Sequence, residues 1–157
     1  MMKSIWIRYV LSALAVAVFG FILLNLLFLL DFGFQSLIDA LAQLFTSAAP
    51  NTEISWFPPL KHFLFLLVIG LVSWPILRSK ISQVYKAIFL VVPTALLLVT
   101  IGISFYRWPV VVYSLCTIAT VGILYYFYTT KKSWLYYYSV ILVALALLIA
   151  GLTGTEI

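Results

Sequence analysis

Five long apolar stretches constrain this chain more than any other feature. Each is about as long as the ~20 residues that an α-helix needs to cross the ~30 Å hydrocarbon core of a bilayer. The stretches cover residues 9–30, 60–77, 87–106, 109–130 and 135–153. This pattern predicts an all-α integral membrane protein, a five-helix transmembrane bundle that forms a single membrane domain over residues 1–157.

The charged residues divide into two sets when the chain is threaded through these five spans. Seven of the nine cations fall on the side that holds the N-terminus, where no carboxylate lies. These seven are Lys3, Arg8, Arg78, Lys80, Lys86, Lys131 and Lys132. The opposite side receives Lys61, Arg107, Asp31, Asp39, Glu53 and Glu156. Because cytoplasmic loops carry the excess of Lys and Arg, we expect the N-terminus inside, the C-terminus outside and residues 31–59 external.

Composition agrees with a membrane domain and excludes several classes of protein. Only 8% of the residues are charged, against about 25% in soluble domains. The net charge of +5 gathers at helix ends rather than along one face, so we expect no nucleic-acid partner and anionic lipid headgroups instead.

A single cysteine, Cys116, excludes an internal disulfide and a cysteine-rich metal site. The first apolar run is too long for a signal-peptide core, so we expect it to stay as an anchor.

The segment after the first apolar stretch has a different pattern. Asp31, Phe32 and Gly33 interrupt the apolar run. Over residues 34–45, apolar side chains then follow helical spacing with polar side chains on the other side. We therefore expect a separate, short amphipathic helix here that lies on the external surface of the membrane.

Two sets of small residues and one set of polar residues are candidates for helix packing. Small side chains at three- or four-residue spacing share a helix face and let helices approach closely in lipid. The two small-residue sets are Ala13, Ala17 and Gly20, and Ala146, Ala150 and Gly154. The polar candidates are Asn25, Tyr113, Thr117 and Thr120. They either line a path for a neutral solute or bond to backbone carbonyls and hold helices together.

Catalytic chemistry has little support in the sequence. The predicted spans hold no ionisable residue at mid-membrane, which argues against a proton-driven carrier or an intramembrane aspartyl protease. His62 is the only histidine, and a catalytic base or metal ligand there would need partners such as Asp31, Glu53 or Ser55. Nothing in the spacing requires such partners, so we expect an interfacial histidine and no catalytic, cofactor or metal site.

Contacts with lipid headgroups are predicted at both ends of the spans. On the N-terminal side, two lysines lie between tyrosine-rich helix ends, and on the other side Arg107 and Trp108 lie at the level of Lys61. Phenols and cations together suit phosphate oxygens. The alternative is an ordinary aromatic belt with helix-end cations that extend outward into water. The candidates are Lys131, Lys132, Tyr128, Tyr136, Arg107 and Trp108.

Three functions are consistent with this pattern. We favour a non-enzymatic accessory, stabilising or regulatory subunit of a membrane assembly, with membrane lipids and other membrane helices, from copies of this chain or from another protein, as its partners. One alternative is a transporter or channel component for a neutral or lipid-like solute. Another is an enzyme of the outer interface that acts on a lipid-linked substrate through His62. The charge bias favours a bacterial cytoplasmic membrane.

The orientation can be tested by cysteine labelling. Single cysteines at Asn51 and Ser79, in a Cys116→Ser background, should react with impermeant reagents from outside and inside respectively. Labelling of the two positions from the opposite sides would contradict the charge argument.

Overall fold

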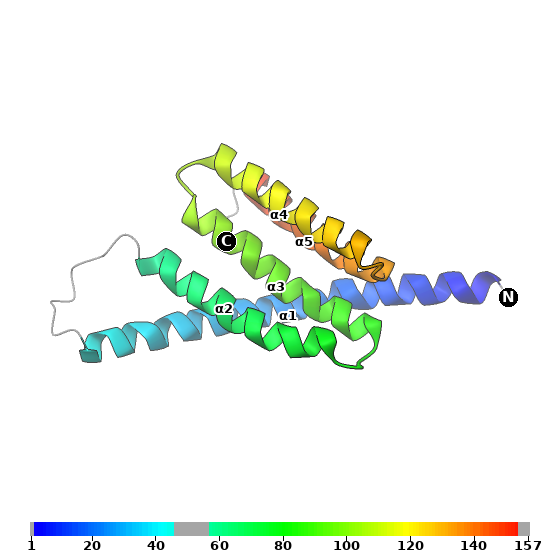
Figure 1. Cartoon of the computed structure of the whole chain (residues 1–157), viewed down its shortest axis with the longest axis horizontal. Coiled ribbons are helices and arrows are strands. Elements are labelled where there is room, and N and C mark those ends of the chain that lie inside the picture. Colours follow the sequence, from blue (N-terminus) through cyan, green and yellow to red (C-terminus); the bar gives the residue numbers. More distant parts are fainter. Residues whose placement is uncertain (1, 46–56, 154–157) are drawn as a thin grey trace.

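The computed structural model describes residues 2–45 and 57–153, and this part of the chain forms five helices (Figure 1). They are α1 (Met2–Phe45), α2 (Phe57–Arg78), α3 (Gln83–Ser104), α4 (Pro109–Thr129) and α5 (Trp134–Thr153). All five are long and apolar enough to cross a membrane. The prediction of an all-α, multi-pass membrane bundle is confirmed at this level.

The first helix is longer than the sequence pattern predicted. At about 1.5 Å per residue, the 44 residues of α1 extend about 66 Å, which exceeds the ~30 Å hydrocarbon core. Its N-terminal part projects beyond the other helices (Figure 1). The predicted end of the first helix at Leu30 is wrong, and the structure contains no separate helix over residues 34–45, because these residues continue α1.

Contacts between α1 and α2 explain why the helix continues. A glycine such as Gly33 costs only about 1 kcal/mol inside a helix. Asp31 accepts a hydrogen bond from Gln35 one turn later, at 2.8 Å. Phe34 packs on Phe65 of α2, with ring centroids 5.2 Å apart. These interactions outweigh the local signal for a break.

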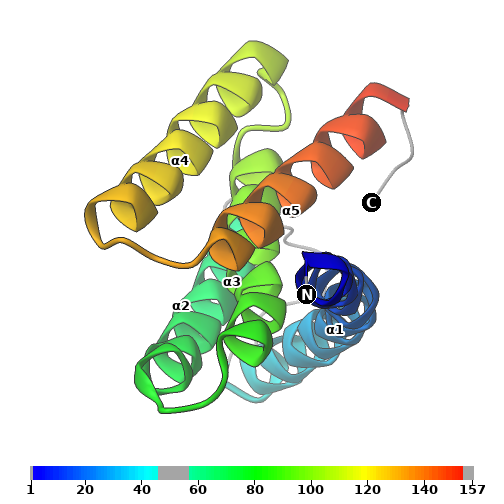
Figure 2. The same cartoon turned by 90° about the vertical axis from the view of Figure 1, so that its right-hand side faces the viewer.

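Helix α3 lies at the centre of the bundle and packs against all four other helices (Figures 1 and 2). Ten of its residues are buried, which is more than in any other helix. Its contacts with α1 and α5 form the main core cluster, which consists of Val16, Ala87, Ile88, Val91, Ala95, Leu98, Leu135 and Val143.

Helices α1 and α3 approach each other closely at a glycine. A Cβ atom added to Gly20 would lie 2.9 Å from Cγ2 of Val91. Val91 is buried and β-branched, so it has little freedom to move aside. Ala13 and Ala17, on the same side of α1, are partly buried. This small-residue set therefore faces the interior of the bundle.

Helix α4 lies at the edge of the bundle. It contacts α3 and α5, and Phe127 is its one buried residue. Short connections, residues 105–108 and 130–133, make it antiparallel to both neighbours. The outward face of α4 is rich in exposed apolar side chains, as expected for a surface in contact with lipid.

We predict that substitution by leucine destabilises the protein at Gly20 but not at Gly33, although both glycines lie in α1. Gly20→Leu should force α1 and α3 apart and lower the free energy of unfolding by about 1–3 kcal/mol, the usual cost of overpacking. Gly33→Leu is the matched control, because a Cβ there meets nothing within 4 Å. Thermal melting in one detergent measures both. Equal melting temperatures for the two variants would contradict the close packing at Gly20.

Candidate functional site

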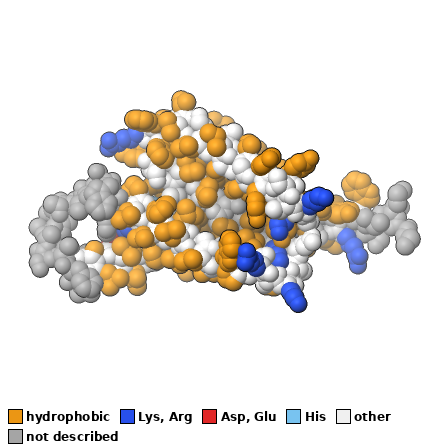
Figure 3. Space-filling model, viewed as in Figure 1, with side chains coloured by type: hydrophobic (Ala, Val, Ile, Leu, Met, Phe, Trp, Pro, Cys, Tyr) orange, Lys and Arg blue, Asp and Glu red, His pale blue; other side chains and the backbone are white. Residues whose placement is uncertain are grey.

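The described charged residues separate into two ends of the bundle. One end, called here the basic end, carries six cations whose side chains are described, and these appear among the blue side chains toward the N-terminal side in Figure 3. They are Arg8, Arg78, Lys80, Lys86, Lys131 and Lys132. The other, called here the opposite end, holds the two described carboxylates, together with Lys61, His62 and Arg107.

A partly buried ion pair joins α1 to α2 at the opposite end. Nζ of Lys61 donates to both carboxylate oxygens of Asp39, at 2.9 and 3.0 Å. Lys61 is only 8% exposed, whereas the Asp39 side chain is 46% exposed. The expectation that Lys61 extends outward as an anchor is wrong, because its ammonium group turns into the bundle to meet Asp39.

A second polar group lies beside this pair. Oδ2 of Asp31 accepts a hydrogen bond from the Gln35 amide and lies 3.1 Å from Nδ1 of His62, although this ring nitrogen does not have the direction for a hydrogen bond. Nε2 of His62 lies 3.3 Å from Nε2 of Gln35. Oδ1 of Asp31 is buried without a hydrogen-bond partner. We call Asp31, Gln35, Asp39, Lys61 and His62 the α1–α2 polar cluster.

The α1–α2 polar cluster places a carboxylate beside a histidine but lacks the rest of a catalytic centre among the described residues. In a general-base pair the carboxylate accepts a hydrogen bond from the ring, and Asp31 lies close to His62 without forming one. Among the described residues, no hydroxyl or thiol forms a hydrogen bond with His62, and no group of three potential metal ligands is present. Two predicted partners, Glu53 and Ser55, lie outside the described residues. The contact of Lys61 with Asp39 makes the cluster a polar link between α1 and α2.

Sequence reasoning missed this cluster although its signal is present. Asp31, Gln35 and Asp39 recur at four-residue spacing, which places them on one face of a continuous helix. Interpreting Asp31 as the end of a span separated it from the other two. A continuous helical interpretation of residues 9–45 would have grouped them opposite Lys61 and His62.

A cavity of about 700 Å³ lies between α3, α4 and α5, from the opposite end toward the middle of the bundle. We call it the α3–α4–α5 cavity. Leu98 and Ile103 of α3, Val112 of α4, and Leu147 and Leu148 of α5 give it an apolar wall. None of its lining residues carries a charge. A cavity of this size and chemistry suits an apolar ligand.

Three of the four predicted polar candidates line this cavity. Thr117 and Thr120 donate their hydroxyl protons to carbonyls of their own helix, at 2.7 and 2.8 Å. Tyr113 reaches toward α5, where a Cβ added to Gly151 would lie 3.3 Å from its hydroxyl oxygen. Asn25 is elsewhere: its amide donates to the Phe21 carbonyl at 2.8 Å, on an exposed part of α1.

The second small-residue set is divided between two environments. Ala150 lines the α3–α4–α5 cavity, whereas Ala146, one turn earlier on α5, is exposed. Gly154 lies outside the described residues. The face that α5 turns to the core is instead formed by Leu135, Tyr136, Ser139, Val140 and Val143. Whether Ala146 contacts another chain stays a prediction.

The predicted headgroup residues at the basic end are not all at the surface. Lys131, Lys132 and Tyr128 are exposed. Tyr136 is buried, with its ring against Phe127 at a centroid distance of 5.7 Å. The structure therefore does not bring Tyr136 to the lysines as a surface group.

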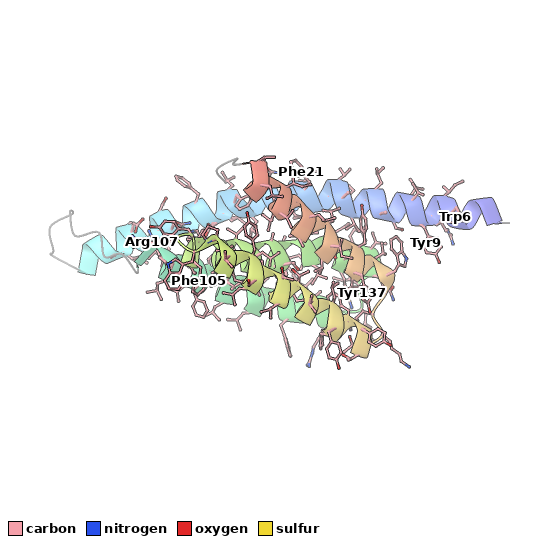
Figure 4. All side chains as sticks on the ribbon, turned by 90° about the horizontal axis from the view of Figure 1, so that it is seen from above. Trp6, Tyr9, Phe21, Phe105, Arg107 and Tyr137 are labelled. Carbon is pink, nitrogen blue, oxygen red and sulfur yellow. The ribbon has the colours of Figure 1, made fainter. Side chains whose placement is uncertain are left out.

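Arg107 and Trp108 are both exposed at the opposite end, where Figure 4 marks Arg107 at the turn between α3 and α4. Nε of Arg107 donates to the Tyr106 hydroxyl at 2.9 Å, and this hydrogen bond raises the pKa of the guanidinium. Arg107 is charged at neutral pH with or without this hydrogen bond. Lys61, bound to Asp39, does not join it.

Comparison with protein families, with characterised proteins and with solved structures finds no match to this chain.

We predict that the two partners of the Lys61–Asp39 ion pair differ in their contribution to stability, because Lys61 is buried and Asp39 is half exposed. The buried ammonium group of Lys61 contacts the Asp39 carboxylate. Asp39→Asn removes the negative charge from this contact, so it should lower the free energy of unfolding by about 1–3 kcal/mol. Lys61→Met should cost less, because the Asp39 carboxylate is half exposed and solvent can hydrate it. Urea or thermal unfolding in detergent measures both. A larger loss for Lys61→Met would contradict the burial described above.

Proposed function

We propose that this chain is a non-enzymatic multi-pass membrane protein that binds a neutral, lipid-like molecule in the α3–α4–α5 cavity. The single observation that carries the proposal is the cavity itself, with its volume of about 700 Å³ and its apolar wall. Such a cavity in a lipid-facing part of a bundle accepts a molecule that already resides in the bilayer. The protein would act as a carrier component or as an accessory subunit of a membrane assembly.

The lining supports a neutral ligand over an ionic one. It has no cation to pair with a phosphate and no carboxylate to pair with an amine. The hydroxyl protons of Thr117 and Thr120 are already used within α4, so both side chains offer only acceptor lone pairs. The Tyr113 hydroxyl has no hydrogen-bond partner among the described residues and is available as a donor. An ester or carbonyl group on an otherwise apolar molecule can accept a hydrogen bond from Tyr113, and a hydroxyl group can also donate one to Thr117 or Thr120.

The orientation and the location are part of the same proposal. The excess of cations at the basic end supports a cytoplasmic position for that end and an external position for the opposite end. The α3–α4–α5 cavity then faces the outer leaflet of a cell membrane, and a bacterial cytoplasmic membrane suits the charge bias. Residues 34–42, at the end of α1, then lie at the outer interface, where their polar side chains meet water.

Two alanines on α5 provide a matched test. Ala150→Leu adds three carbons inside the cavity, whereas Ala146→Leu adds them on an exposed face one turn away. Native mass spectrometry after mild extraction should detect a bound apolar molecule in wild type and in Ala146→Leu, and about tenfold less of it in Ala150→Leu. Equal ligand occupancy in both variants would contradict the proposed site.

A role as an assembly subunit is the second candidate, and exposed Ala146 is the observation that favours it. The set on α1 faces the bundle interior, but Ala146 is exposed and can meet another helix. The same two variants separate the candidates, because loss of a co-purified partner in Ala146→Leu alone would support assembly. No partner in wild type would remove this candidate.

A further inference from the structure

A second cleft, of about 460 Å³, lies at the basic end between three helices. It is lined by Arg8, Tyr9 and Ser12 of α1 and by Gln83 and Val84 at the start of α3. Trp134 and Leu135 at the start of α5, with Ser133 just before it, complete the lining. The cleft contains none of the residues predicted to contact headgroups, and it is at the other end of the bundle from the α3–α4–α5 cavity.

The polar side chains of this cleft are available to a ligand. Within the part of the chain that the structure describes, Arg8, Ser12, Gln83 and Ser133 have no hydrogen-bond or ion-pair partner for their side chains. Ser12 is notable because serines inside helices commonly bond to the carbonyl four residues earlier, as Ser36 does here at 2.9 Å. A cation, two hydroxyls and an amide therefore converge with their donors unused.

The aromatic wall fixes the position of Arg8 relative to α5. Tyr9 packs edge-on against Trp134, with ring centroids 5.5 Å apart, and Figure 4 marks Tyr9 on the side of α1 near the start of α5. Trp134 in turn packs against Tyr138, at 6.2 Å. Tyrosine and tryptophan favour the headgroup level of a bilayer. The cleft thus lies at the depth where lipid phosphates reside.

Charge favours an anion at this position. The basic end carries six cations with described side chains, and the carboxylates of Asp31 and Asp39 lie at the opposite end. Arg78 is engaged elsewhere, with its guanidinium 4.4 Å from the centroid of the Trp74 ring. Among the cations of the basic end, Arg8 lines the cleft. The amide groups at the starts of α3 and α5 add a smaller favourable potential.

We propose that this cleft binds the phosphate group of an anionic phospholipid. Arg8 forms the charge-assisted contact, Ser12, Ser133 and Gln83 donate hydrogen bonds to the remaining phosphate oxygens, and Trp134 packs against the glycerol region. Bound lipid would join α1 to α3 and α5 at the end of the bundle where the starts of these helices meet. The same chemistry also accepts free phosphate, so the test separates the two sources.

The test uses the full chain in a neutral detergent and measures binding of short-chain phosphatidylglycerol by native mass spectrometry. Arg8→Gln should weaken binding about tenfold, as expected for loss of a hydrogen bond to a charged group. Arg78→Gln is the matched control, with the same substitution at the same end but outside the cleft, and should change binding less than about twofold. Ser133→Ala should give an intermediate loss without removing any charge.

Three outcomes would change the assignment. Equal weakening by Arg8→Gln and Arg78→Gln would overturn it, because that result describes adsorption to a charged end rather than a site. The same holds if neither phosphatidylglycerol nor sodium phosphate binds wild type. Binding of sodium phosphate without binding of the lipid, lost in Arg8→Gln, would overturn the lipid and leave an anion site for free phosphate.

Discussion

The bundle depends on the close packing of α3 between α1 and α5. In lipid, helices gain little from the hydrophobic effect because acyl chains are as apolar as leucine, so association relies on van der Waals contact and a few polar interactions. The contact of Gly20 with Val91 and the complete burial of Ala87 and Ala95 bring the helix backbones near enough for this packing. With α3 held between α1 and α5, α2 and α4 pack against the outside of this core.

At the opposite end of the bundle, polar contacts join α1 to α2. The α1–α2 polar cluster holds the long α1 against α2, which packs less extensively than α3. The contact of Lys61 with both carboxylate oxygens of Asp39 constrains how α1 and α2 are rotated and how far they are offset along their axes. A different rotation or offset would move the carboxylate away from a buried ammonium group. This geometry explains how Asp31 and Gly33 lie within a continuous helix rather than at its end.

The sequence predicted the number of helices and most of their positions, because a run of about 20 apolar residues has few stable alternatives in a bilayer. It failed at Leu30, where a local break signal competed with contacts to α2 that are invisible in the linear pattern. It also identified Tyr113, Thr117 and Thr120 as one helix face without indicating that α3 and α5 would leave a cavity beside them. Pairing between helices, as in Lys61 with Asp39, depends on relative rotation and offset. Helical periodicity does not supply either quantity.

The α3–α4–α5 cavity and the cleft at the basic end differ in chemistry. The α3–α4–α5 cavity is apolar and uncharged, whereas the cleft at the basic end combines a cation with hydroxyl and amide donors. A phospholipid has both an apolar and an anionic part, but the two regions lie at different ends of the bundle. We therefore assign them to two different molecules, with the cavity as the site of the proposed function.

Photo-crosslinking inside the cavity tests that function most directly. A diazirine analogue of leucine at Leu148, which lines the cavity, should capture one predominant apolar molecule from native membranes. The same analogue at Ile118, which is 67% exposed on α4 and outside the cavity lining, should capture the mixture of bulk lipids. Identical lipid profiles at the two positions would contradict a selective site and reduce the cavity to a surface groove filled by bulk lipid.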